Sequence, residues 1–114
     1  VSIGNVSADD LASLGKYGAS KVLAVKQEGV LQPGAYAQIL AAAAAKVDPK
    51  VVVISHTYTG KSVAPRLAVK LKAGLVSGAV ALPANISPLT VRKKCYSNKG
   101  FTFISDNQVR YRVC

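Results

Sequence analysis

Two kinds of hydrophobic pattern alternate along residues 1–83. Short β-branched runs are typical of buried strands, and longer segments with apolar residues three or four positions apart are typical of helices. The strands predicted in this way cover 1–6, 21–25, 51–55 and 79–82, and the helices cover 7–14, 34–47 and 63–71. This β-α-β-α-β-α-β order predicts an α/β fold of the doubly wound, Rossmann-like type, with a parallel sheet.

Local signals set several of the predicted boundaries. Ser7 is followed by Asp10, which is the spacing of a capping box, and it predicts a helix start. The run VVVIS at 51–55 has no polar interruption before its last residue, so it predicts a strand covered on both faces. Pro65 is tolerated best in the first turn of a helix, and we therefore expect the third helix to begin near Val63.

The pattern changes after Pro83, where the helical periodicity stops. Residues 85–88 are expected to form a loop, and strand-like alternation follows at 91–95, 101–104 and 108–113. Turn residues separate these runs at 97–100 and at 106–107. We expect a small antiparallel extension at the C-terminal end of the parallel sheet.

The chain is strongly basic, and this changes the picture of its partners. Fifteen Lys and Arg against five Asp and Glu give 15 − 5 = +10, which favours anionic partners. Many of the cations lie in the last third of the chain: Arg92, Lys93, Lys94, Lys99, Arg110 and Arg112. They predict either a solvated sheet face that protects its edges from aggregation, or a docking surface.

The cysteines and the apolar runs restrict the cellular setting. Cys95 and Cys114 show neither a CxxC nor a Cys/His spacing, so we expect free thiols and no metal site. The sequence shows no secretory leader and no apolar run of the roughly 18–20 residues that cross a membrane. These features favour a soluble protein in a reducing compartment, with no membrane insertion.

The segment 59–62, TGKS, resembles the end of a phosphate-binding loop. The full loop requires a glycine where Ser55 stands, which argues against nucleotide hydrolysis. A weaker interpretation remains, in which backbone amides near Gly60 and Ser62, together with Lys61 and Arg66, hold an anion or a partner's carboxylate. The alternative is a capped helix with solvated cations.

His56 is the single histidine of the chain and stands at the end of a predicted strand, where open α/β sheets bind ligands. No second histidine and no paired carboxylates lie near it in the sequence, and no nucleophile elbow is present. We therefore expect a polar residue at a strand tip and no independent catalytic site.

Three segments together resemble a known family. They are LGKYGASKVLAV, TGKSVAPRLAVKLKAGLVSGAVAL and KKCYSNKGF, and they resemble the alpha subunit of electron transfer flavoprotein over nearly the whole chain. The residues that carry the likeness are Gly60-Lys61, Pro65-Arg66, Ala68, Leu71, Ser77, Tyr96-Ser97 and Lys99.

The resemblance implies a domain organisation. Residues 1–114 are expected to be part of the N-terminal domain, a Rossmann-like sheet of the adenine nucleotide alpha hydrolase-like type that lacks its first strand and helix. The C-terminal domain, which carries most contacts to FAD in the family, is expected to be absent. No FAD-binding residue is therefore assigned, and no cofactor is expected on this chain alone.

The resemblance also implies a function. In the intact heterodimer, FAD carries electrons from acyl-CoA dehydrogenases and other dehydrogenases to a quinone reductase or another acceptor. This segment is then the scaffold that docks the beta subunit, as part of an electron carrier and not of an enzyme. The expected location is the bacterial cytoplasm, with the mitochondrial matrix as the alternative.

Two other functions are compatible with parts of the sequence. A small basic module that binds anions or nucleic acid would explain the charge, although few aromatics are available for base stacking and no specific nucleic-acid motif occurs. A universal-stress-like nucleotide-binding domain would share the fold. Its distinguishing feature is a glycine-rich phosphate loop, which this sequence does not contain.

Overall fold

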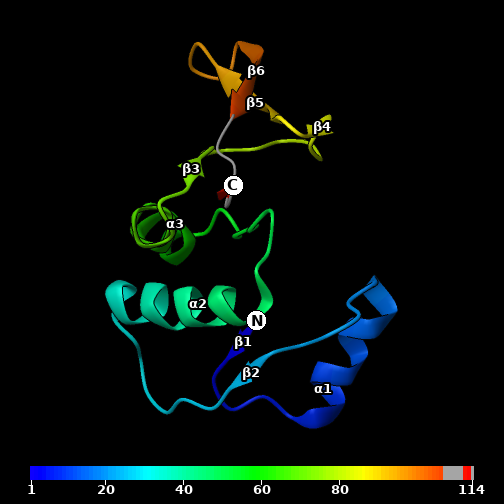
Figure 1. Ribbon diagram of the computed structural model, residues 1–114, viewed down its shortest axis with the longest axis vertical. Coiled ribbons are helices and arrows are strands. Elements are labelled where there is room, and N and C mark those ends of the chain that lie inside the picture. Colours follow the sequence, from blue (N-terminus) through cyan, green and yellow to red (C-terminus); the bar gives the residue numbers. More distant parts are fainter. Residues whose placement is uncertain (107–111, 114) are drawn as a thin grey trace. The chain divides into compact units, whose positions relative to one another are not determined.

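The computed structural model describes residues 1–106 and 112–113 (Figure 1). The chain divides into two compact units, Val1–Gln32 and Pro33–Cys114. Each unit contributes one parallel strand pair, and the second unit adds a three-stranded antiparallel sheet. The fold is therefore α/β and Rossmann-like, with an antiparallel extension, as the sequence predicted.

The first unit is a parallel strand pair joined by a helical crossover. Strands β1 (Ser2–Ile3) and β2 (Ala24–Val25) pair in parallel, and helix α1 (Ala8–Ser13) lies between them in the sequence (Figure 1). Parallel neighbours require such a connection, because a tight turn joins only antiparallel strands. Both strands are shorter than the predicted runs 1–6 and 21–25.

Ser7 caps the start of α1 as predicted, and Asp10 bonds back to its hydroxyl. The backbone N–H of Asp10 donates to the Oγ of Ser7 at 3.2 Å, and the Ser7 hydroxyl donates to Asp10 Oδ2 at 2.6 Å. A 3₁₀ helix, Leu14–Tyr17, extends α1 by one turn and ends at Gly18, whose φ of 92° is left-handed. Glycine tolerates that conformation without the steric cost that a Cβ would add.

Helices α2 (Pro33–Val47) and α3 (Tyr58–Leu71) form the larger core of the second unit. Ala37 and Leu67 are 0% exposed and Val63 is 3% exposed where the helices meet. Tyr36, Leu40, Ala41, Val52, Ile54 and Leu71 pack around these buried residues. The small Ala37 side chain allows the two helices to approach closely, so that the longer side chains of α3 fill the interface.

The start of α3 differs from the prediction. The helix begins at Tyr58, before the expected Val63, because Thr57 caps it. Pro65 consequently lies inside the helix and not in its first turn. A proline there removes one backbone hydrogen bond, and the packing of Val63 and Leu67 against α2 offsets that loss.

The prediction of a doubly covered strand at 51–55 is wrong. The segment contains only a β-bridge at Val52, and Val53 is 75% exposed. Val52 and Ile54 pack on the α2–α3 core, whereas Val51 packs against a second cluster of Val76, Leu89 and Val91. The segment thus alternates as a strand does, but within 51–55 only Val52 takes part in a β-bridge.

The parallel pair of the second unit also lies elsewhere than predicted. Strand β3 covers Gly74–Leu75 and pairs in parallel with β7, Arg112–Val113. The expected strand at 79–82 is reduced to an antiparallel bridge between Ala79 and Lys93. The prediction of an antiparallel strand at 108–113 is wrong for residues 112–113, because β7 pairs in parallel with β3. Residues 108–111 lie outside the described part of the chain.

The antiparallel extension forms largely as predicted. Strands β5 (Leu89–Cys95) and β6 (Gly100–Asp106) make a hairpin, with Val91 opposite Ile104 and Cys95 opposite Gly100. The expected loop 85–88 contains an additional short strand, β4 (Asn85–Ile86), which pairs with β5. Side chains of β5 alternate between buried and exposed, so the hairpin has one core face and one solvent face.

Truncating Leu67 should destabilise the second unit strongly. We expect Leu67→Ala to lower the free energy of unfolding by about 2–5 kcal/mol, because it leaves a cavity at a fully buried helix contact. Val69→Ala on the same helix is the matched control, since Val69 is 78% exposed and its loss should cost below about 0.5 kcal/mol. Urea unfolding of both variants measures the difference, and equal losses would contradict this packing.

Candidate binding site at the start of helix α3

The predicted site residues lie in the first turns of α3, where Thr57 organises the backbone. Thr57 is extended, and its Oγ1 accepts a hydrogen bond from the N–H of Gly60 at 3.1 Å. The Thr57 carbonyl accepts the N–H of Lys61 at 2.9 Å. The amides of Gly60 and Lys61, which a phosphate loop would aim at a ligand, therefore already have partners inside the chain.

Gly60 has a packing role that the sequence pattern did not reveal. The residue is buried, and a Cβ at this position would collide with the backbone carbonyl of Ser55 and lie 3.1 Å from Ile54 Cγ2. The absence of a side chain lets the segment before the helix fold back across its first turn. A glycine in the first turn of a helix, preceded by a capping threonine, is the signal that indicates such a close approach.

The other predicted site residues point to separate places. The side chains of Lys61 and Arg66 are exposed, and five positions on a helix separate them by about 140° around its axis. The Ser62 hydroxyl donates to the carbonyl of Thr59 at 2.7 Å. The structure therefore does not bring Lys61 and Arg66 to one point, and a common anion site for all four residues stays a prediction.

A cavity of about 130 Å³ lies beside the start of α3. Gly60, Lys61, Ala64 and Pro65 of the helix contribute one part of its lining. The remaining residues come from the segments before the helix and after it: Ile54, Ser55, His56, Leu75, Val76, Ser77 and Gly78. The GKS segment thus borders a small cavity through Gly60 and Lys61, and neither Ser62 nor Arg66 belongs to its lining.

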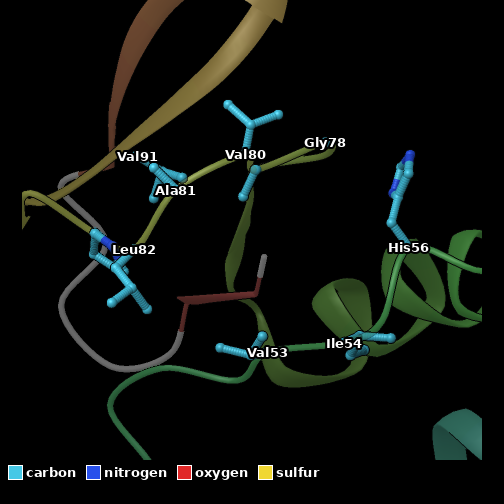
Figure 2. Close-up of a pocket in the computed structure, with 10 residues that line it drawn as sticks. Val53, Ile54, His56, Gly78, Val80, Ala81, Leu82 and Val91 are labelled. Carbon is cyan, nitrogen blue, oxygen red and sulfur yellow. The ribbon is translucent and has the colours of Figure 1, made fainter.

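A larger pocket, of about 350 Å³, adjoins the same segment (Figure 2). Val53, Ile54 and His56 line it from one segment, and Gly78, Val80, Ala81 and Leu82 line it from another, as Figure 2 shows. Val91 of the hairpin completes the labelled lining (Figure 2). Of the described residues that line this pocket, His56 is the ionisable one, and the others are mostly aliphatic.

The chemistry available at these two cavities is limited. Among the described residues, the ionisable side chains that line them are His56 and Lys61, and none is a carboxylate. Such a site offers apolar contact and a cation, and it would favour an apolar group or an anion over a metal ion. Across residues 1–106 and 112–113, no three His, Cys, Asp or Glu side chains come together as metal ligands.

The structure also bears on the predictions for the cysteines and for membrane-spanning helices. Cys95 is a free cysteine, as expected, and Cys114 lies outside the described residues. Within the described part of the chain, no helix is both long enough and apolar enough to cross a membrane.

The fold and this site define an α/β domain with a modified phosphate-loop-like turn, and comparison with known proteins assigns the family. The model of the electron transfer flavoprotein domain matches residues 1–109. The chain therefore belongs to the electron transfer flavoprotein domain family, as the three quoted segments predicted.

Two similar relatives are bacterial alpha subunits. The electron transfer flavoprotein subunit alpha of Bacillus subtilis is 31% identical over 87 residues, which cover 75% of this chain and 27% of that protein. The protein of the same name from Syntrophomonas wolfei is 31% identical over 86 residues, which cover 74% and 27% of the two chains. The chain thus spans about a quarter of the length of these relatives.

Adding a methyl group at Gly60 should destabilise the start of α3. Alanine favours a helix over glycine by about 1 kcal/mol, but the collision with Ser55 should outweigh this and cost about 1–3 kcal/mol in total. Gly34→Ala is the control, because its new Cβ would meet only Arg66 Nη1 at 3.9 Å in the first turn of α2. Thermal unfolding should rank Gly60→Ala below the parent and Gly34→Ala at or above it. A stabilised Gly60→Ala variant would contradict the close approach.

Proposed function

We propose that this chain acts as part of the N-terminal domain of an electron transfer flavoprotein alpha subunit. The observation that carries the proposal is the family match over residues 1–109, together with the 31% identity to alpha subunits. In this role the chain is a scaffold that docks a beta subunit. It belongs to an electron carrier, which moves electrons between other enzymes and catalyses no reaction of its own.

FAD is the cofactor of the proposed intact heterodimer, but the residues described here do not fit it. A dinucleotide needs backbone amides open to its diphosphate, usually in a glycine-rich turn. At the TGKS turn, the amides of Gly60 and Lys61 bond to Thr57, and Gly60 packs against Ser55. We therefore assign no FAD contact to this chain and expect no flavin on it alone.

The proposed electron donors are acyl-CoA dehydrogenases of fatty acid β-oxidation and other dehydrogenases. The proposed acceptor is a quinone reductase or another redox protein, reached through the heterodimer and not through this chain alone. The bacterial sources of the two relatives support a place in the bacterial cytoplasm, with the mitochondrial matrix as the alternative.

Four residues were predicted as contacts to an anion or to a partner's carboxylate, Gly60, Lys61, Ser62 and Arg66, and the two cations among them keep this proposed role. With the amides of Gly60 and Lys61 bonded inside the chain, this role falls to the side chains. Lys61 borders the small cavity together with His56, whereas Arg66 is exposed on another side of α3. Two separate contacts fit this arrangement better than one shared anion.

A small basic module that binds anions or nucleic acid is the second candidate function. The net charge of +10 favours it. Purely electrostatic binding to a nucleic acid would weaken steeply as salt rises, whereas a docked protein interface with an apolar centre would persist.

Mixing the 114-residue chain with FAD, and separately with the beta subunit of the same organism, tests the proposed function. We expect the chain to elute together with the beta subunit from a sizing column and to take up no flavin on its own, as followed by flavin absorbance. We expect this because the scaffold contacts the partner, while the amides of Gly60 and Lys61 are already bonded to Thr57. Tight flavin binding by the chain alone, or no association with the beta subunit, would contradict the proposal.

A further inference from the structure

The solvent face of the β5–β6 hairpin combines cations with aromatic rings. Strand register places Lys94 opposite Phe101, Arg92 opposite Phe103, and Thr90 opposite Ser105. Directly opposed residues of an antiparallel pair point to the same side of the sheet. These residues form one surface, which we call the hairpin face: Thr90, Arg92, Lys94, Phe101, Phe103 and Ser105.

The two phenylalanines of the hairpin face are open to solvent. Phe101 is 53% exposed and Phe103 is 61% exposed, although they are the two phenylalanines of the chain. The opposite face of the same hairpin buries Leu89 and Val91 completely. The core therefore does not use the rings of Phe101 and Phe103, and adjacent exposed aromatics on one sheet face are typical of an interaction surface.

Arg92 is already held in a geometry suited to binding a carboxylate. Its Cζ lies 3.9 Å from the centroid of the Phe101 ring, which is a cation–π contact. A guanidinium stacked in this way keeps the N–H groups of its edge available, and these match a carboxylate in a two-hydrogen-bond arrangement. The stacking also restricts the side chain before a partner arrives, which lowers the entropy lost on binding.

The charges of the hairpin face have one sign. Arg92 and Lys94 are exposed on it, and no Asp or Glu belongs to the six residues that form it. Beyond its last ladder pair, the turn adds Tyr96, which is 84% exposed, and the exposed cation Lys99. Charge complementarity therefore calls for an anionic partner, and the two rings call for one that also carries apolar side chains.

We propose that the hairpin face is the docking surface for a protein that presents carboxylates beside apolar side chains. The assignment rests on the proposed function, and the occupant is the beta subunit. Arginine and aromatic residues are the types enriched at such interfaces, and they supply most of their binding energy. A nucleic acid fits less well, because the guanidinium of Arg92 covers one side of the Phe101 ring and leaves fewer open rings for base stacking.

Charge reversal and ring removal on this face test the proposal in the 114-residue chain. Binding to the beta subunit is measured by calorimetry for the parent, Arg92→Glu and Phe103→Thr. Both variants should weaken binding by about tenfold or more, as expected for central interface residues. Lys50→Glu is the control, because it reverses the same charge at an exposed position outside the hairpin, and it should change the affinity by less than about threefold.

Folding of the variants is checked by circular dichroism and by the midpoint of urea unfolding. Where Arg92→Glu shifts that midpoint, Arg92→Lys replaces it as the decisive variant. It retains the charge but loses the planar guanidinium, so binding should still weaken while the fold is kept.

The outcomes separate this proposal from the proposed function. If the parent binds the beta subunit and the hairpin variants bind it equally well, the hairpin face is not the docking surface, and the proposed scaffold function stands. If the parent does not bind the beta subunit, both are overturned. An oligothymidylate bound at moderate salt, with affinity lost in Phe103→Thr and an unchanged beta-subunit affinity, would overturn the protein partner in favour of a nucleic acid.

Discussion

The contact between helices α2 and α3 is the main core of the second unit, and the position of the candidate site depends on it. Leu67 and Val63 fill the space that the small Ala37 leaves on the facing helix, and this interface buries them almost completely. Hydrophobic burial of this kind is the main favourable term in folding, and no other cluster described here joins two long helices. Because α3 is fixed by this contact, its first turn and the cavities beside it are fixed as well.

At the start of α3 the sequence resembles the end of a phosphate loop, but the structure uses the same residues to cap and pack a helix. The TGKS sequence places a glycine, a lysine and a serine at a helix start, as in a phosphate loop. In the structure Thr57 accepts hydrogen bonds from the amides of Gly60 and Lys61, and the glycine allows a close approach to Ser55. The same residues that would cradle a phosphate therefore cap and pack a helix.

The hairpin divides its residues between stability and recognition. Its inner face carries Leu89 and Val91, which form the second core cluster with Val76. Its outer face carries Arg92 and both phenylalanines, which no core cluster uses. The period of two along a strand makes this division possible, because alternate residues serve opposite faces. Of the basic run at 92–94, Arg92 and Lys94 are thus exposed on the outer face, and Lys93 lies half-buried on the other face.

The sequence by itself determined the class of fold, the helix over residues 34–47, the cap at Ser7 and the two long hairpin strands, because propensity, capping and alternation are local properties. It also determined the family, through three segments. Only the tertiary structure decided that 51–55 forms no continuous strand, that α3 begins at Tyr58, and that 112–113 pairs in parallel with β3. Strand pairing depends on which distant backbone lies alongside, and the position of Lys61 relative to Arg66 depends on where the helix starts. Neither the strand pairing nor the relative position of these two cations can be read from the local pattern of residues.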